Sequence, residues 1–210
     1  MKVMLVNGSP HEKGCANAAL EEVEAALAQE EIATERFWIG REPLTGCLGC
    51  GFCAIQGRCC YDDVVNRFLE RAEACDGFVF GAPVHFATAA ASMVAFLDRA
   101  FFVDHCAGLG RFAWKPAAAV VSARRAGTTA ALDELNKYFL YAQMPIVSSH
   151  YWNMVHGQTP EQVRQDEEGM QIMRVLGKNI AWLLKSIATG KREGLRPPAQ
   201  EERLNTNFIR

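Results

Sequence analysis

The stretch Lys2-Val3-Met4-Leu5-Val6-Asn7-Gly8-Ser9-Pro10 begins with an apolar run that stops at glycine, serine and proline. A short apolar run bounded by turn residues is typical of a buried β-strand. After a polar loop, residues 16–29 carry leucine and valine at helical spacing, and residues 34–39 can form a second strand. A strand, a helix and a second strand in this order predict a parallel, doubly wound α/β sheet.

The rest of the chain continues this alternation. Further strands are expected at 77–81, 117–121 and 146–148, and further helices at 62–74, 92–102, 129–142 and 169–187. Asp62 is expected to cap the first of these helices. The segment 42–61 is rich in glycine and cysteine and is expected to be an ordered loop rather than a helix. We therefore expect one domain over residues 1–189, followed by a polar tail or arm over residues 190–210.

The composition argues against several classes of function. The 210 residues include 22 Lys or Arg and 24 Asp or Glu, for a net charge of −2, which gives no electrostatic reason for binding nucleic acid or an anionic membrane. No apolar run approaches the roughly 20 residues that span a bilayer, and the first strand is too short for a secretory signal. We therefore expect a cytoplasmic protein whose eight cysteines are reduced.

The loop between the first strand and the first helix, residues 8–17, has the features of a phosphate site. It combines Ser9 and Gly14 with the backbone N–H groups of a helix N-terminus, which bind an anion without a strong positive charge. It matches neither the P-loop nor the spaced-glycine dinucleotide pattern. The alternative is a plain turn in which Ser9 and Asn17 act as caps.

Two further loops follow strands and are expected at the same edge of the sheet, where ligands bind in open α/β folds. Residues 81–86 place a rigid proline and an aromatic pair where they can form a wall for a flat ring. Residues 122–129 contain two arginines that can pair with a phosphate or a reduced, anionic flavin, and two threonines that can cap the next helix. Core aromatics and solvated surface arginines are the respective alternatives.

Five of the eight cysteines lie in one short segment, from Cys47 to Cys60. Cys47, Cys50, Cys53 and Cys59 have the spacing C-x2-C-x2-C-x5-C, and thiolates at this compact spacing can ligate a [4Fe–4S] cluster. The segment lacks the proline that follows the fourth cysteine in bacterial ferredoxins. A zinc site and a reduced segment without any ligand remain alternatives.

In their order and spacing these motifs resemble the NADPH-dependent FMN reductase family of the flavodoxin-like superfamily. The resemblance rests on Gly-Ser-Pro after the first strand, Ala-Pro-Val-His-Phe after the third, Gly-Thr-Thr after the fourth, Asp98-Arg99 and the cysteine segment. It covers residues 1–182. It implies a flavodoxin-like three-layer sandwich, with helices on both faces of a five-stranded parallel sheet of order 2-1-3-4-5. The cysteine spacing is similar to that of the iron–sulfur flavoproteins, a branch of this family.

The resemblance also implies which residues bind FMN. Its phosphate would lie against Ser9, Pro10, Gly14, Cys15, Ala16 and Asn17. The ring edge and ribityl chain would be lined by Pro83, Val84, His85 and Phe86, and the other side of the ring by Ser122, Arg124, Gly127 and Thr128. His85 and Arg124 are the candidate catalytic residues, which would tune the ring or orient an acceptor. Many relatives have tyrosine in place of His85 and polar residues in place of Cys15 and Ala16, which bears on donor and acceptor preference.

By the same resemblance the chain is expected to be an NAD(P)H-dependent FMN reductase. Electrons would pass from the nicotinamide through FMN to a quinone, a flavin, another small molecule or a redox protein. A homodimer or homotetramer is expected, with residues 151–153 covering the flavin or lining the subunit contact. The alternatives are an iron–sulfur flavoprotein or flavodoxin-type electron carrier that serves protein partners, and a flavin-free binding module.

Overall fold

The computed structural model describes residues 1–202, 204, 206 and 208. Its centre is a parallel sheet of β1 (Lys2–Asn7), β2 (Ala33–Trp38), β3 (Gly77–His85), β5 (Ala117–Ala123) and β6 (Met154–His156). The strand order is β2-β1-β3-β5-β6, and β4 (Thr88–Ala89) pairs antiparallel with the end of β3. Counted without β4, this is the order 2-1-3-4-5, which confirms the expected flavodoxin-like fold.

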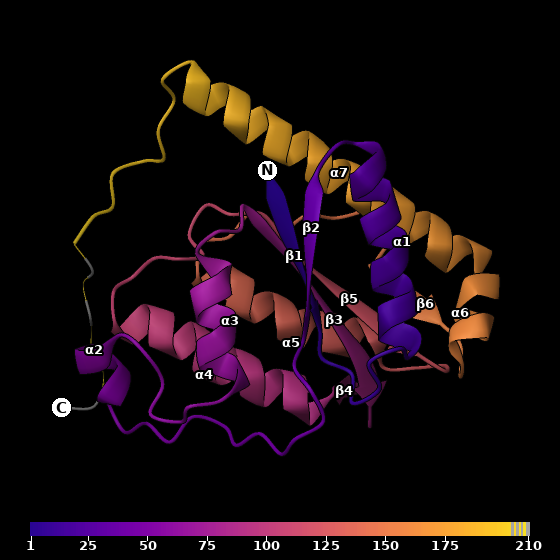
Figure 1. Cartoon of the computed structure of the whole chain (residues 1–210), viewed down its shortest axis with the longest axis horizontal. Coiled ribbons are helices and arrows are strands. Elements are labelled where there is room, and N and C mark those ends of the chain that lie inside the picture. The colour runs from indigo at the N-terminus through magenta and orange to yellow at the C-terminus, as the bar shows by residue number, and fades with distance from the viewer. Residues whose placement is uncertain (203, 205, 207, 209–210) are drawn as a thin grey trace.

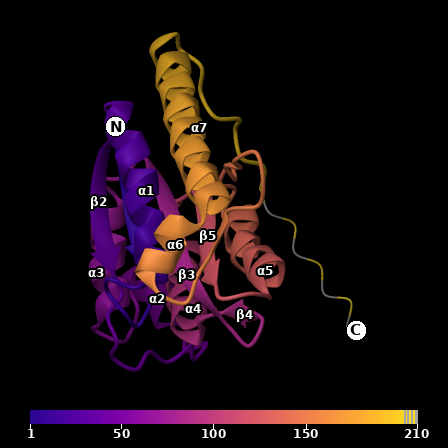
Figure 2. The same cartoon turned by 90° about the vertical axis from the view of Figure 1, so that its right-hand side faces the viewer.

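Helices cover both faces of the sheet (Figure 1, Figure 2). One layer consists of α1 (Cys15–Gln29), α6 (Pro160–Gln165) and α7 (Glu167–Arg192), and the other of α3 (Val64–Ala72), α4 (Ala91–Cys106) and α5 (Thr128–Tyr141). Successive strand residues point to opposite layers: Met4 and Val6 belong to the core beneath α3, α4 and α5, whereas Val3 and Leu5 belong to the core beneath α1 and α7. The central strands are therefore apolar on both faces.

The fifth strand lies later in the chain than the expected 146–148. Ile146 forms only an isolated bridge to Ala117, at the beginning of β5, and the strand proper, β6, pairs with the end of β5. Between these two points the Ser149 hydroxyl donates to the carbonyl of Tyr151 at 2.7 Å. Such local side-chain bonds compete with strand pairing, so the chain leaves the sheet edge and returns to it at Met154.

Several local expectations are also wrong. The cysteine segment contains a short helix, α2 (Phe52–Gln56). The cap of α3 is Asp63 rather than Asp62, because the Asp63 carboxylate accepts the N–H of Val65 at 3.0 Å. The N-cap residue of α5 is Gly127, and no threonine side chain caps it. The helix α6 was not expected, although Thr159 followed by a proline is a recognisable helix start.

The final helix, α7, ends at Arg192 rather than at residue 187. The expected boundary between domain and tail, at residues 189 and 190, therefore falls within its last turns. Residues 193–202 are exposed. Within the described chain, no helix combines the length and the apolar character needed to cross a membrane.

Candidate functional site

At the carboxyl edge of the sheet, the loop after β1 contacts β3, and the loop after β5 contacts the hairpin that follows β3. The N–H of Gly8 donates to the carbonyl of Gly81 at 2.8 Å, which joins the first loop to β3. Gly127 has a φ of +91°, and a Cβ placed there would lie 2.5 Å from the Cα of Ala87. Glycine is thus required both by the left-handed backbone and by the close approach of the hairpin after β3. Both neighbouring loops are thus joined to β3 or to the hairpin at its end.

The first loop is shaped by its own side chains. The Asn7 side chain accepts the N–H of Ser9 at 2.9 Å, and the Ser9 hydroxyl accepts the N–H of His11 at 3.1 Å. Asn7 also donates to the carbonyl of Glu12 at 2.8 Å. Ser9 is buried, so its hydroxyl acts within the loop, while Pro10 beside it is half-buried. The loop is therefore ordered before any ligand is considered.

The N-terminus of α1 is open toward this loop. Gly14 occupies the N-cap position with an extended backbone and offers no capping side chain. The first N–H groups of a helix lack partners within the helix, and the helix dipole makes this end positive. The backbone N–H groups of Cys15, Ala16 and Asn17 are thus suited to bind a phosphate.

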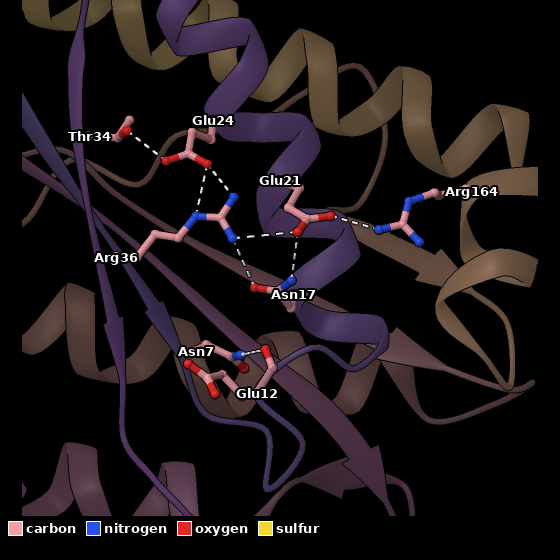
Figure 3. Close-up of polar contacts among 8 residues, drawn as sticks. All are labelled: Asn7, Glu12, Asn17, Glu21, Glu24, Thr34, Arg36 and Arg164. Carbon is pink, nitrogen blue, oxygen red and sulfur yellow. Dashed lines mark hydrogen bonds and ion pairs between the residues drawn. The ribbon is translucent and has the colours of Figure 1, made fainter.

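The side chain of Asn17 is engaged elsewhere, as Figure 3 shows. Its amide nitrogen donates to Glu21 at 2.9 Å, and its oxygen accepts Arg36 at 3.2 Å. Arg36 in turn pairs with Glu24 at 2.8 Å, and Arg164 of α6 donates to Glu21 at 2.7 Å. This network joins α1 to β2 and α6. Asn17 can therefore contribute its backbone N–H to a phosphate, while its side chain fixes the position of the helix.

The loop after β3 is a tight hairpin with a strained turn. Phe86 and Ala87 have φ values of 50° and 63°. Two successive positive φ angles are typical of a type I′ turn, which favours asparagine and glycine, and other residues there cost about 1 kcal/mol or more each. Glu134 of α5 stabilises the hairpin by accepting the N–H of Ala89 at 3.0 Å. The side chains of His85 and Phe86 are exposed at its end.

The carboxyl end of β5 carries a buried hydroxyl that lacks a partner among the described residues. The Ser122 Oγ forms no hydrogen bond with any residue that the structure describes, although Ser122 is only 3% exposed. It lies beside Pro83 of β3 in the sheet register. An unsatisfied buried polar group costs about 1–3 kcal/mol, so this position suits a polar ligand atom. Thr128 is also buried, whereas Arg124 is exposed.

A fourth loop, after β6, also reaches this edge, and the sequence analysis missed it. The Cys15 thiol donates to the carbonyl of Gly157 at 3.8 Å, which joins the start of α1 to the end of β6. Burial raises the pKa of this thiol. The loop was missed because the fifth strand was expected at 146–148. Gly157, two positions after the apolar pair Met154-Val155, was the signal that could have revealed it.

The structure thus gathers the candidate residues of the three expected loops at one edge of the sheet. They are Ser9, Pro10, Gly14, Cys15, Ala16, Asn17, Pro83, Val84, His85, Phe86, Ser122, Arg124, Gly127 and Thr128. Tyr151 and Trp152 lie just before β6, with ring centroids 4.7 Å apart, and both are exposed, whereas Asn153 is buried. Their expected part in a flavin cover or a subunit contact stays a prediction.

The cysteine segment forms a second feature of the surface. Cys47, Cys50, Cys53, Cys59 and Cys60 all line one depression beside α4. The sulfurs of Cys50 and Cys60 lie 3.7 Å apart. Burial and the neighbouring Cys106 thiol raise the pKa of Cys53 to about 11.

The arrangement of these thiols bears on which metal could bind. Among the described residues, no three His, Cys, Asp or Glu side chains converge closely enough to hold a single ion. In a [4Fe–4S] cluster each thiolate binds a different iron, and the cysteines that line this depression include a suitable donor set for it.

A parallel sheet of order 2-1-3-4-5, with its ligand loops at the carboxyl edge, defines the class of flavodoxin-like proteins. Solved structures agree with this class. A flavodoxin from the domain Archaea superposes with a TM-score of 0.59 at 14% identity, covering 88% of this chain and 99% of that one. An NAD(P)H:quinone oxidoreductase from Methanothermobacter marburgensis superposes with a TM-score of 0.63 at 16% identity, covering 86% and 96%.

Residues 1–159 match the family model of the NADPH-dependent FMN reductases, and the chain belongs to that family. An iron–sulfur flavoprotein of Methanocaldococcus jannaschii is 29% identical over 198 residues, which are 89% of this chain and 99% of the relative. Family membership defines the chain as a flavodoxin-like flavin oxidoreductase with FMN as its cofactor.

Proposed function

We propose that this chain passes electrons from a reduced nicotinamide dinucleotide, through FMN bound at the carboxyl edge of the sheet, to a quinone, a flavin or another acceptor. The observation that carries the proposal is the combination of the open N-terminus of α1 with the unsatisfied hydroxyl of Ser122 at the same edge. One feature suits a phosphate and the other a polar atom of a buried ligand.

The first loop would hold the phosphate of FMN. Backbone N–H groups of Cys15, Ala16 and Asn17 would donate to it, and the Ser9 hydroxyl keeps the loop in the shape that presents them. Because Lys13 is the only lysine or arginine in residues 8–17, the helix dipole would supply most of the electrostatic attraction.

The other two loops would hold the ring. Pro83 and Val84 are half-buried and would pack against its edge, while the Ser122 hydroxyl would bond a polar ring atom. Arg124 is exposed beside this position and would neutralise negative charge on the ring. His85 stands at the hairpin, where it would orient an acceptor. FMN, when bound, supplies the redox chemistry, and these residues set its position and electrostatics.

This proposal is tested by FMN titration followed by NADH and NADPH oxidation with quinone or free flavin as acceptor. We expect stoichiometric FMN binding and turnover with at least one acceptor. Arg124→Gln should lower kcat, whereas the matched variant Arg125→Gln, at the neighbouring exposed position, should not. FMN binding without any turnover would reject the enzyme and favour a carrier.

A second candidate function is that of an iron–sulfur flavoprotein, in which Cys47, Cys50, Cys53 and Cys59 would hold a [4Fe–4S] cluster. The specific observation in its favour is that all four line one depression, and the Methanocaldococcus jannaschii relative carries this name. Such a cluster would supply one-electron transfer to a protein partner.

Anaerobic purification with iron and acid-labile sulfide analysis tests the cluster. We expect four irons and four sulfides per chain, lost in Cys47→Ser and retained in Cys106→Ser, because Cys106 lies outside the four-cysteine pattern. Purified protein with FMN but without iron would reject this second function and leave the first intact.

A further inference from the structure

Arg99 of α4 is a buried charge beneath the cysteine segment. Its side chain is only 1% exposed. It pairs with Asp63 through two bonds of 2.7 and 3.0 Å, and its guanidinium lies 4.8 Å from the ring centre of Tyr61. A buried charge requires such partners, because desolvation without them is very costly.

Two further N–H groups of this guanidinium are directed at a sulfur atom. Its Nε and Nη2 donate to the Sγ of Cys59, at 3.3 and 3.2 Å. The other thiols of the segment have only backbone N–H groups or thiols as partners among the described residues. Cys47 accepts one backbone N–H at 3.4 Å, Cys50 has the N–H of Phe52 and the Cys60 thiol beside it, and Cys53 has the Cys106 thiol. Cys59 therefore differs from its neighbours, since two donors of a positive group hold its sulfur.

The same contact distinguishes Cys59 from the adjacent Cys60. Either residue could follow Cys53 at a compact spacing, so spacing alone does not separate them. Cys59 is half-buried and held by Arg99, and its backbone N–H donates to the side chain of Asn66 at 2.9 Å. Cys60 is exposed, and the neighbours of its sulfur are the thiols of Cys50 and Cys59, which carry no positive charge.

We propose that Arg99 is a positioning residue that holds Cys59, rather than Cys60, as the fourth cluster ligand and raises the reduction potential of the bound cluster. The inference rests on the proposed iron–sulfur function. Reduction places an additional negative charge on the cluster and its ligand sulfurs, and N–H donors to a sulfur stabilise that charge. Asp63 opposes this effect, because its carboxylate partly neutralises the guanidinium.

The test is the midpoint potential of the cluster, followed by EPR in an anaerobic redox titration of variants with equal iron content. Arg99→Gln removes the charge and the forked guanidinium donors and should give the lowest potential. Arg99→Lys retains the charge but loses the forked donors and should lie between Gln and wild type. Asp63→Asn should raise the potential, and asparagine can still cap α3. The control is Arg111→Gln, which should leave the midpoint potential unchanged, because Arg111 pairs with Glu73 and Asp104 instead.

Ligand assignment is tested in parallel by iron content, where Cys59→Ser should lose the cluster and Cys60→Ser should keep it. Opposite shifts for Arg99→Gln and Asp63→Asn would support the proposal, because a purely structural role predicts no such pair of signs. Unchanged potentials, shifts of equal sign, or a cluster lost only in Cys60→Ser would overturn it. If Arg99→Gln does not fold, an unchanged potential in Asp63→Asn is sufficient to overturn it. A wild-type protein without iron would instead reject the underlying function, and the inference with it.

Discussion

The indole Nε1 of Trp38 donates a hydrogen bond of 2.8 Å to the carbonyl oxygen of Ser9. Trp38 is the last residue of β2, and Ser9 lies in the loop after β1, so the bond joins the sheet to the candidate phosphate loop. A single bond of this kind contributes about 1 kcal/mol. The loop is thus supported from the strand that lies beside it.

Trp38→Phe is expected to weaken FMN binding without unfolding the protein. The substitution keeps an aromatic ring but removes the donor, and about 1 kcal/mol corresponds to roughly a fivefold rise in Kd. Quenching of FMN fluorescence on titration measures this Kd. The control is Trp182→Phe, which changes an exposed tryptophan on α7. Equal affinity in wild type and Trp38→Phe would show that the bond does not order the loop.

Ser122→Ala should leave the stability of the free protein unchanged or slightly higher, but it should reduce the stabilisation that FMN provides. Removal of an unsatisfied buried hydroxyl leaves the free protein as stable or slightly more stable. The same change removes a proposed ligand contact, so the increase in Tm on adding FMN should become smaller. Ser92→Ala is the comparison, because the Ser92 hydroxyl donates to the carbonyl of Gly8 at 3.3 Å and its loss should lower the Tm of the free protein. A full FMN-induced shift in Ser122→Ala would exclude Ser122 from the site.

Gly127→Ala is expected to destabilise the fold and displace the hairpin after β3. A left-handed backbone costs alanine about 1 kcal/mol, and the new Cβ would lie 2.5 Å from the Cα of Ala87. Gly110→Ala is a matched control, because Gly110 has a φ of +62° with nothing within 4 Å of the added Cβ. In denaturant unfolding, the free energy of unfolding should fall at least twice as much in Gly127→Ala as in Gly110→Ala. Equal losses would mean that the contact between the two loops is dispensable.

Asp104→Asn should reduce the dependence of stability on pH in mildly acidic solution. Burial raises the pKa of Asp104, so the folded protein retains a proton that the unfolded chain releases. The contribution of this proton to the free energy of unfolding is fully present below the pKa that Asp104 has in the unfolded chain. It is lost as the pH rises through the higher pKa that Asp104 has in the folded protein. The asparagine variant has no such proton and can still accept the Arg111 N–H, bonded at 2.9 Å in wild type. As the pH rises from 4 to 7, the denaturant midpoint should therefore fall less in the variant than in wild type. The same dependence of the midpoint on pH in both proteins would contradict a raised pKa for Asp104.

Much of the fold could be predicted because its signals are local. The apolar run of β1 stopped by Gly8-Ser9-Pro10, the helical spacing in α1 and the repeated alternation of the two were sufficient for the order 2-1-3-4-5 once the family resemblance was recognised. The ligand loops could be placed together because parallel strands end at one edge of their sheet. Burial on both faces makes those strands continuously apolar, which is visible in sequence.

The parts that local patterns missed depend on partners far away in the chain. The position of β6 was decided by pairing with the end of β5, and both 146–148 and 154–156 carry apolar residues. The side chain of Asn17 was a plausible phosphate ligand until the fold placed Arg36 and Glu21 beside it.

The sequence by itself determined the class of fold, the edge at which ligands bind and the cysteine spacing, because each of these follows from residue type and short-range periodicity. The tertiary structure alone decided that Arg99 bonds to Cys59 and that the Ser122 hydroxyl is buried without a partner among the described residues. It also decided that Gly127 is the glycine that lets two loops approach each other closely. The physical reason is that hydrogen bonding and close packing depend on distances between atoms of residues that lie far apart in the chain, such as Arg99 and Cys59, which are 40 positions apart.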